Sequence, residues 1–210
     1  VAALRQARAT PCGVLLVIRV ELVEDLLPQT QCRQCGFPGC RAYAEAIAAG
    51  EALINRCPTG GARTIGRLAE LLGTAPLPLD PEYGREMPFA VARVKAEGCI
   101  GCGWCEDACP VDAITGVPKH LYAVLEADCT GCGLCVPACP MDTIEFVEPG
   151  RSWTDEDAHR AKAAYEKNAA RRAARQAEID AELERRRQTT RKGLVADILA
   201  QVRKSGRSAS

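Results

Sequence analysis

A short cysteine pattern occurs twice in the chain, and this repeat constrains the fold more than any other feature of the sequence. The first copy begins at Cys99 and reads CIGCGWCEDACP, and the second begins at Cys129 and reads CTGCGLCVPACP. Residues 99–114 and 129–144 are identical at ten of sixteen aligned positions, including all four cysteines of each copy. A repeat with this offset predicts two equivalent halves related by a pseudo-twofold axis.

Each copy has the spacing C-x2-C-x2-C-x3-C-P, which is the run found in bacterial two-cluster ferredoxins. In such a run, thiolates hold [4Fe-4S] clusters, and the fourth cysteine is a ligand of the other cluster. Zinc sites are built from two separated pairs of ligands, so a triple run followed by Cys-Pro favours iron and sulfur. The expected ligands of one cluster are Cys99, Cys102, Cys105 and Cys139. Those of the other are Cys129, Cys132, Cys135 and Cys109.

A third set of four cysteines precedes the repeat, namely Cys32, Cys35, Cys40 and Cys57. Their spacing alone is compatible with zinc as well as with a third [4Fe-4S] cluster. Because a ferredoxin unit follows, we expect a third cluster that stands at one end of the electron path. Phe37 is expected to shield this cluster, and the remaining cysteine, Cys12, to be a free thiol.

The composition argues against several other classes of protein. Thirteen cysteines is an odd number, and no secretory signal peptide is recognisable, so a secreted disulfide scaffold is not expected. No Ser/His/Asp set, P-loop or Gly-x-Gly-x-x-Gly fingerprint is visible, and we predict no catalytic residue of the chain's own. His120 and His159 stand alone in the sequence and are expected at the surface.

The sequence predicts an α+β protein with a small helical four-cysteine domain, a pseudo-twofold 2[4Fe-4S] ferredoxin domain and a long charged C-terminal helix. Apolar spacing and glycine stops indicate helices over 22–27, 41–49 and 62–72, and alternation indicates a strand over 91–95. Helices are also expected over 154–192 and 194–202. The expected segments are a poorly ordered 1–18, a four-cysteine domain 19–75, a Pro-rich linker 76–90, a ferredoxin domain 91–148 and a basic helical tail 149–210.

The zero net charge of the chain hides a separation of charge. Residues 91–150 carry three basic and nine acidic side chains, whereas residues 151–210 carry fifteen basic and nine acidic ones. The acidic excess around the two repeated motifs favours low cluster potentials. Because acids are interleaved with the arginines of the tail, we expect no nucleic-acid binding, and contact with anionic lipid or an acidic partner is the better interpretation.

Residues outside the cysteines give a more specific resemblance. Residues 26–47, LLPQTQCRQCGFPGCRAYAEAI, together with residues 54–61, INRCPTGG, closely resemble the RnfB (RsxB) family, a component of the Rnf (Rsx) ion-translocating electron transport complex. The resemblance implies three [4Fe-4S] clusters, with Cys32, Cys35, Cys40 and Cys57 as ligands of the N-terminal one. It also implies an electron-transfer role in a translocase complex whose other subunits are partners, with ferredoxin as a further candidate partner.

Many members of that family begin with a hydrophobic membrane anchor, and the longest apolar run near the start of this chain, residues 13–18, is too short to span a bilayer. We therefore expect a short form that associates peripherally with the cytoplasmic face of the bacterial inner membrane, with the basic tail in place of the anchor. The alternatives are a freestanding polyferredoxin, an electron-transfer subunit of a soluble reductase, and a regulatory or assembly protein whose first site holds zinc.

Overall fold

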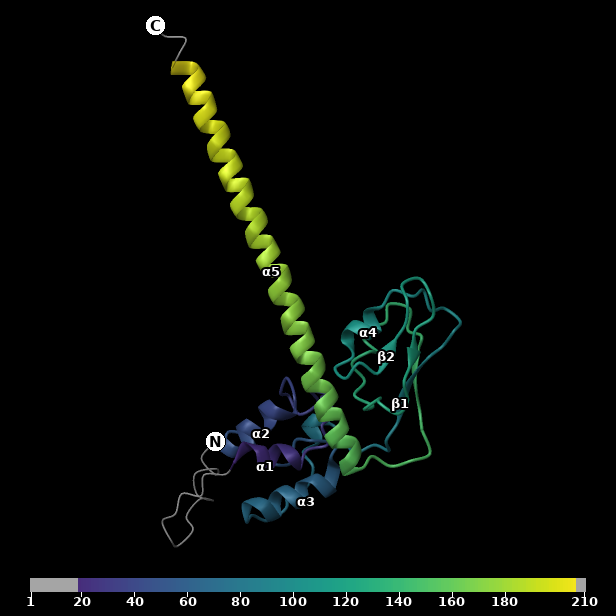
Figure 1. Ribbon diagram of the computed structural model, residues 1–210. Helices are drawn as coiled ribbons and strands as arrows, with labels where there is room; N and C mark the ends of the chain where they lie inside the picture. Colours follow the sequence, from purple (N-terminus) through teal and green to yellow (C-terminus); the bar gives the residue numbers. More distant parts are fainter. Residues whose placement is uncertain (1–18, 207–210) are drawn as a thin grey trace, which may run out of the picture. The chain divides into compact units, whose positions relative to one another are not determined.

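The computed structural model describes residues 19–206, with side chains described as far as residue 199. The segment 1–18, which was predicted to be poorly ordered and contains Cys12, lies outside the described residues. The chain divides into two compact units, Val1–Glu166 and Lys167–Ser210. The fold is α+β, as the sequence predicts, with short helices, two small sheets and a long C-terminal helix (Figure 1).

Three helices form the N-terminal four-cysteine domain, namely α1 (Val20–Asp25), α2 (Cys40–Ala49) and α3 (Gly61–Leu72). Half of the ten residues of α2 are alanine, the residue with the highest helix propensity. Both α2 and α3 end at a glycine in the left-handed conformation, Gly50 and Gly73, whose N–H groups bond to carbonyls of the last helical turn. The helices expected from glycine stops and apolar spacing are therefore confirmed.

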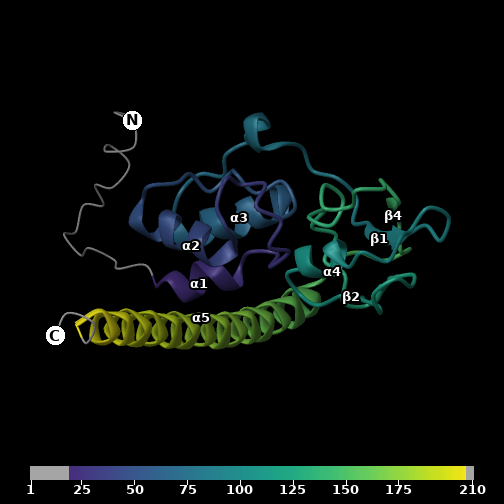
Figure 2. The ribbon, with the colours of Figure 1, turned by 90° about the horizontal axis from the view of Figure 1, so that it is seen from above.

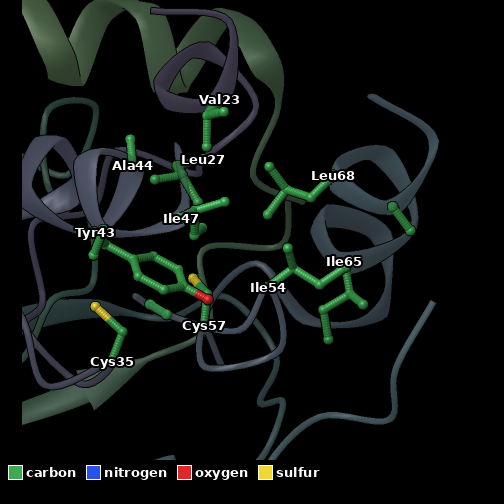
Figure 3. Close-up of a cluster of buried hydrophobic side chains, with 13 residues drawn as sticks. Val23, Leu27, Cys35, Tyr43, Ala44, Ile47, Ile54, Cys57, Ile65 and Leu68 are labelled. Atoms are coloured by element: carbon green, nitrogen blue, oxygen red, sulfur yellow. The ribbon is translucent and has the colours of Figure 1, made fainter. Parts of the chain in front are cut away.

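The core of this domain is built around Tyr43, whose side chain is only 1% exposed. Val23, Leu27 and Leu68 approach from α1, the segment after it and α3, and each is almost completely buried. Figure 3 shows these side chains gathered together with the sulfur atoms of two cysteines of the first set. Full burial of an aliphatic side chain contributes about 1.5–3 kcal/mol. The same packing that stabilises the domain therefore also positions two of its thiols.

The segment 76–90, which was predicted as an extended linker, is held against the four-cysteine domain. The side-chain amide of Asn55 donates to the carbonyl of Pro78 at 2.8 Å, and the N–H of Asp80 donates back to the carbonyl of Asn55 at 2.9 Å. A single 3₁₀ turn, η2 (Pro81–Tyr83), follows and is capped by the carboxylate of Asp80. Side-chain amides of this kind carry no periodic signal, so sequence patterns do not reveal the docking.

Two antiparallel strand pairs form the ferredoxin domain. Strand β1 (Val91–Val94) pairs with β4 (Ile144–Val147), and β2 (Ile114–Thr115) pairs with β3 (Ala123–Val124). The first and last strands of the domain are therefore neighbours, which closes it (Figure 2). The predicted strand over 91–95 is confirmed, one residue shorter.

The two halves of this domain repeat one another in backbone conformation. Gly101 and Gly131 both have φ of +67°, and Asp112 and Asp142, one in each half, have φ of +57° and +51°. Secondary structure departs from the symmetry in one place, since the first half contains helix α4 (Trp104–Ala108) and the matching residues 134–138 form turns. The repeat in sequence is therefore a repeat in conformation.

Helix α5 (Asp155–Gly206) is continuous over 52 residues. The prediction of two helices with a break near Gly193 is wrong, because an interior glycine costs only about 1 kcal/mol and its neighbours on both sides favour helix. The prediction that the helix is solvated from its start is also wrong, since Asp157, Ala158 and Ala161 are buried. None of the described helices has a stretch that is both long and apolar enough to cross a membrane.

A capping box begins helix α5. The N–H of Thr154 donates to the Asp157 carboxylate at 3.0 Å, while the N–H of Asp157 is directed at the Thr154 hydroxyl at 3.2 Å. Arg151 and Arg160 both bind the same carboxylate, and Arg160 also donates to the carbonyl of Ala127 at 3.0 Å. The start of α5 is therefore fixed to the ferredoxin domain.

Candidate iron–sulfur sites

The ferredoxin domain contains two small, largely apolar cavities, and each is lined by four cysteines. The cysteines around the first cavity are Cys99, Cys102, Cys105 and Cys139. Those around the second are Cys109, Cys129, Cys132 and Cys135. In each cavity three cysteines come from one half of the repeat and the fourth comes from the other half. The structure thus brings together the same two sets that the spacing predicts.

Several cysteine sulfurs in these cavities lie within hydrogen-bonding distance of donors of the surrounding chain. The N–H of Ala113 donates to Cys109 Sγ at 3.2 Å, and the N–H of Ala92, on β1, donates to Cys129 Sγ at 3.4 Å. Cys139 Sγ lies 3.4 Å from the hydroxyl of Thr143. Donors aimed at sulfur stabilise negative charge there, which suits a thiolate ligand.

Glycine is required where the chain turns around each cavity. A Cβ at Gly101 would lie 2.5 Å from the backbone of His120, and one at Gly131 would lie 2.4 Å from the carbonyl oxygen of Ala90. Both positions also have a left-handed backbone conformation that other residues rarely adopt. The two glycines therefore allow neighbouring backbone to close over the cysteine loops.

The first cysteine set lies at the edge of the N-terminal core. Cys35 and Cys57 are buried, whereas Cys32 and Cys40 are partly exposed. Cys32 Sγ lies 3.2 Å from the hydroxyl of Thr59. Phe37 stacks on Tyr43, with ring centroids 5.3 Å apart and an interplanar angle of 29°. The shielding role of Phe37 stays a prediction, and this stacking shows what holds its ring.

A chain of buried amides positions the loop that leads into the first set. Gln29 donates to the carbonyl of Glu24 at 2.6 Å, Gln31 donates to Gln29 at 3.0 Å, and the N–H of Cys40 donates to Gln31 at 2.9 Å. Both glutamines are almost completely buried and have positive φ. Sequence reasoning missed these two residues, because a Gln-x-Gln pair has no periodicity that marks it as buried.

Burial makes a bare thiolate unfavourable in all three sets. It raises the pKa of Cys57 to about 12, that of Cys132 to about 11 and that of Cys135 to about 12, and neighbouring thiols of the same set add to the rise. For Cys139, burial also acts to raise the pKa, but hydrogen bonds from Thr143 and its neighbours outweigh it and the pKa is lowered. Thiols gathered in this way need positive charge among them to ionise, which a bound metal supplies.

The first set adjoins one particular half of the ferredoxin domain. The hydroxyl of Thr130, between Cys129 and Cys132, donates to the carbonyl of Thr30 at 3.1 Å, and both threonines are 2% exposed. The indole N–H of Trp153 donates to the carbonyl of Pro28 at 3.0 Å. These partners are 100 and 125 residues apart in the chain, and no sequence pattern predicts their contact.

A larger cavity of about 800 Å³ lies beside this contact. Its lining includes Thr59, next to the first cysteine set, and Cys132 of the second half of the repeat. Both histidines are exposed, as predicted. Within residues 19–206, no three His, Cys, Asp or Glu side chains converge closely enough to hold a single metal ion.

Comparisons with known proteins agree with this geometry. Residues 27–59 match a family model described as "Putative Fe-S cluster", and residues 92–146 match one described as a 4Fe-4S dicluster domain. The chain is 56% identical over 136 residues to the RnfB component of the ion-translocating oxidoreductase complex of Stutzerimonas stutzeri, a match that covers 63% of this chain and 70% of the relative.

Two further relatives are named as the same component of the ion-translocating oxidoreductase complex. The protein from Thiobacillus denitrificans is 55% identical over 105 residues, and that from Alkalilimnicola ehrlichii is 61% identical over 108 residues. Each match covers 50% of this chain, and the chain spans 56% and 58% of the two relatives' own lengths.

Proposed function

Because the chain belongs to the RnfB family of ion-translocating oxidoreductase complexes, we propose that it is an electron-transfer subunit that holds three [4Fe-4S] clusters. The observation that carries this proposal is the grouping of the repeated cysteines into two crosswise sets of four around two cavities. A bound [4Fe-4S] cluster accepts and gives up one electron at a time. The chain's own part is to position the clusters and to set their potentials.

The proposed ligands are the twelve cysteines of the three sets. Cys32, Cys35, Cys40 and Cys57 would hold one cluster, and the two crosswise sets of the ferredoxin domain would hold one each. The donors directed at Cys109 and Cys129 support this assignment, because iron-bound thiolates accept hydrogen bonds of this kind. The match to an iron–sulfur family model over residues 27–59 favours a cluster over zinc in the first set.

The order of the relay follows from the contact between Thr30 and Thr130. Thr30 lies two residues before Cys32, and Thr130 lies inside the second cysteine run, so the first site and the Cys129 site are neighbours. The Cys99 site is lined only by residues of the ferredoxin domain. Because electron tunnelling requires short gaps, we place the Cys129 cluster between the other two.

The relatives are named as one component of an ion-translocating oxidoreductase complex, and we infer that this chain works with the other subunits of an Rnf-type complex. It would pass electrons between ferredoxin or nicotinamide-nucleotide partners and membrane redox subunits, which couple the flow to ion translocation. The chain would associate peripherally with the cytoplasmic face of the inner membrane. The arginine- and lysine-rich part of α5 beyond Glu166 supports such an association through anionic lipid.

An anaerobic pull-down of the tagged full-length protein from its host's membrane fraction tests this function. We expect recovery of integral membrane redox subunits and of a flavin- or nucleotide-binding partner. A protein recovered alone, and only from the soluble fraction, would contradict the proposal and favour a freestanding polyferredoxin or a soluble reductase subunit. The role of the tail should be tested by truncation after Glu166, because the earlier turns of α5 belong to the first compact unit.

A further inference from the structure

Arg56 is a partly buried guanidinium directly before Cys57 in the chain. Its Nε atom is buried and has no hydrogen-bond partner. Its Cζ atom lies 5.1 Å from the centre of the Tyr83 ring, and its backbone N–H donates to the hydroxyl of Tyr43 at 3.1 Å. The side chain is therefore covered by one aromatic ring, and its backbone is fixed by another.

Within the described residues, no carboxylate forms an ion pair with Arg56. Arg41, in the same domain, instead binds the carboxylates of Glu21, Glu24 and Glu45. Leaving a charged donor buried without an acceptor costs about 1–3 kcal/mol or more. An arrangement of this kind persists when another group satisfies the donor or benefits from the charge.

The acceptor available near Arg56 is the first cysteine set. Burial raises the pKa of Cys35, and the positive charge of Arg56 is among the influences that act in the opposite direction. Tyr83, which covers the guanidinium, also approaches the loop between Cys35 and Cys40, since a Cβ at Gly36 would lie 3.4 Å from its ring. The guanidinium and the cysteine loop therefore share one aromatic cover.

We propose that Arg56 sets the reduction potential of the first cluster by placing an unpaired positive charge and a buried N–H donor beside it. This inference rests on the proposed function, in which the first cysteine set holds a [4Fe-4S] cluster. One-electron reduction adds negative charge to a site that already contains four thiolates. A fixed positive charge in a poorly solvated position stabilises the reduced form more than the oxidised form, so the potential becomes less negative.

The charge distribution gives this residue a functional consequence. The ferredoxin domain has nine acidic and three basic side chains in residues 91–150, and this excess lowers the potentials of its two clusters. Arg56 acts on the first cluster in the opposite direction. The resulting difference favours electron flow from the ferredoxin pair towards the four-cysteine domain.

The test is a redox titration of the full-length, anaerobically reconstituted protein, followed by electron paramagnetic resonance. The signal of the first cluster is identified by its loss in a Cys32→Ala variant. Arg56→Gln removes the charge and keeps an amide donor. We expect its first-cluster potential to be more negative by at least the equivalent of a tenfold change in the reduction equilibrium, about 59 mV for one electron. The potentials of the other two clusters should stay unchanged.

Arg33→Gln is the matched control, because Arg33 is also next to a cysteine of the first set but is exposed to solvent. Water screens its charge, so we expect little shift. Tyr83→Leu is a second variant in case Arg56→Gln does not assemble, since loss of the ring admits water and should shift the potential in the same direction. A first cluster with an unshifted potential in these variants, or an equal shift in Arg33→Gln, would overturn the role of Arg56. Wild-type protein with only two clusters would instead overturn the proposed function.

Discussion

Tyr43→Phe tests the idea that the core and the first cysteine site are one structure. The Tyr43 hydroxyl donates to the carbonyl of Leu53 at 2.7 Å and accepts the N–H of Arg56 at 3.1 Å, in a side chain that is 1% exposed. The substitution keeps the ring and leaves two buried backbone groups without a partner. An unsatisfied buried polar group costs about 1–3 kcal/mol, so we expect a loss of about 2–4 kcal/mol in total. Domains of this size are stable by only about 5–15 kcal/mol.

Anaerobic urea denaturation of the reconstituted protein measures the effect, with the visible absorbance of the clusters as the readout. We expect Tyr43→Phe to lose about a third of the cluster absorbance at a clearly lower urea concentration than the wild type, because one of three proposed clusters lies in this domain. Tyr83→Phe is the control, because it removes the same hydroxyl from a half-buried tyrosine for which the structure records no side-chain hydrogen bond among the described residues. Equal midpoints for Tyr43→Phe and Tyr83→Phe would refute the reasoning.

Two further predictions concern the ferredoxin domain and helix α5. Gly101→Ala should prevent assembly of the Cys99 cluster, measured as lost iron, whereas Gly150→Ala, where a Cβ meets nothing within 4 Å, should cost only the left-handed conformation, about 1–2 kcal/mol; full iron loading of Gly101→Ala would contradict the steric argument. Asp157→Asn should lower the stability at neutral pH by about 1–2 kcal/mol through the weakened capping box. Burial acts to raise the pKa of Asp157, but hydrogen bonds from Thr154 and two arginines lower it below its ordinary value of 3.8, so the stabilisation is present above that value and is lost as the pH falls through the lowered pKa. Thermal unfolding at several pH values checks this, and an equal effect of Asp157→Asn at strongly acidic and at neutral pH would contradict it.

The cysteine sets could be predicted from the sequence because ligand spacing is a local property. A run such as Cys99 to Cys109 specifies both the chemistry and the tight turns, and the repeat adds the pseudo-twofold symmetry. Helix ends were equally readable, since Gly50 and Gly73 adopt the left-handed conformation that favours glycine. In all these cases the cause of the structure lies within a few residues of its effect.

Contacts between distant segments could not be read in the same way. The bond from Thr130 to Thr30 and the bond from Trp153 to Pro28 each join one side chain to one backbone carbonyl. Such single contacts leave no pattern in the chain, although they decide which halves of the molecule meet. The capping box of α5 was readable in principle, because a threonine followed three residues later by an acidic residue is a recognised helix start.

The most direct test of the account is a count of metal and sulfide in the anaerobically reconstituted full-length protein and in its Cys32→Ala variant. Three [4Fe-4S] clusters predict about twelve iron and about twelve acid-labile sulfide per chain, falling to about eight of each in the variant. Zinc in the wild type with about eight iron, or an unchanged count of about twelve iron in Cys32→Ala, would contradict the assignment of the first site.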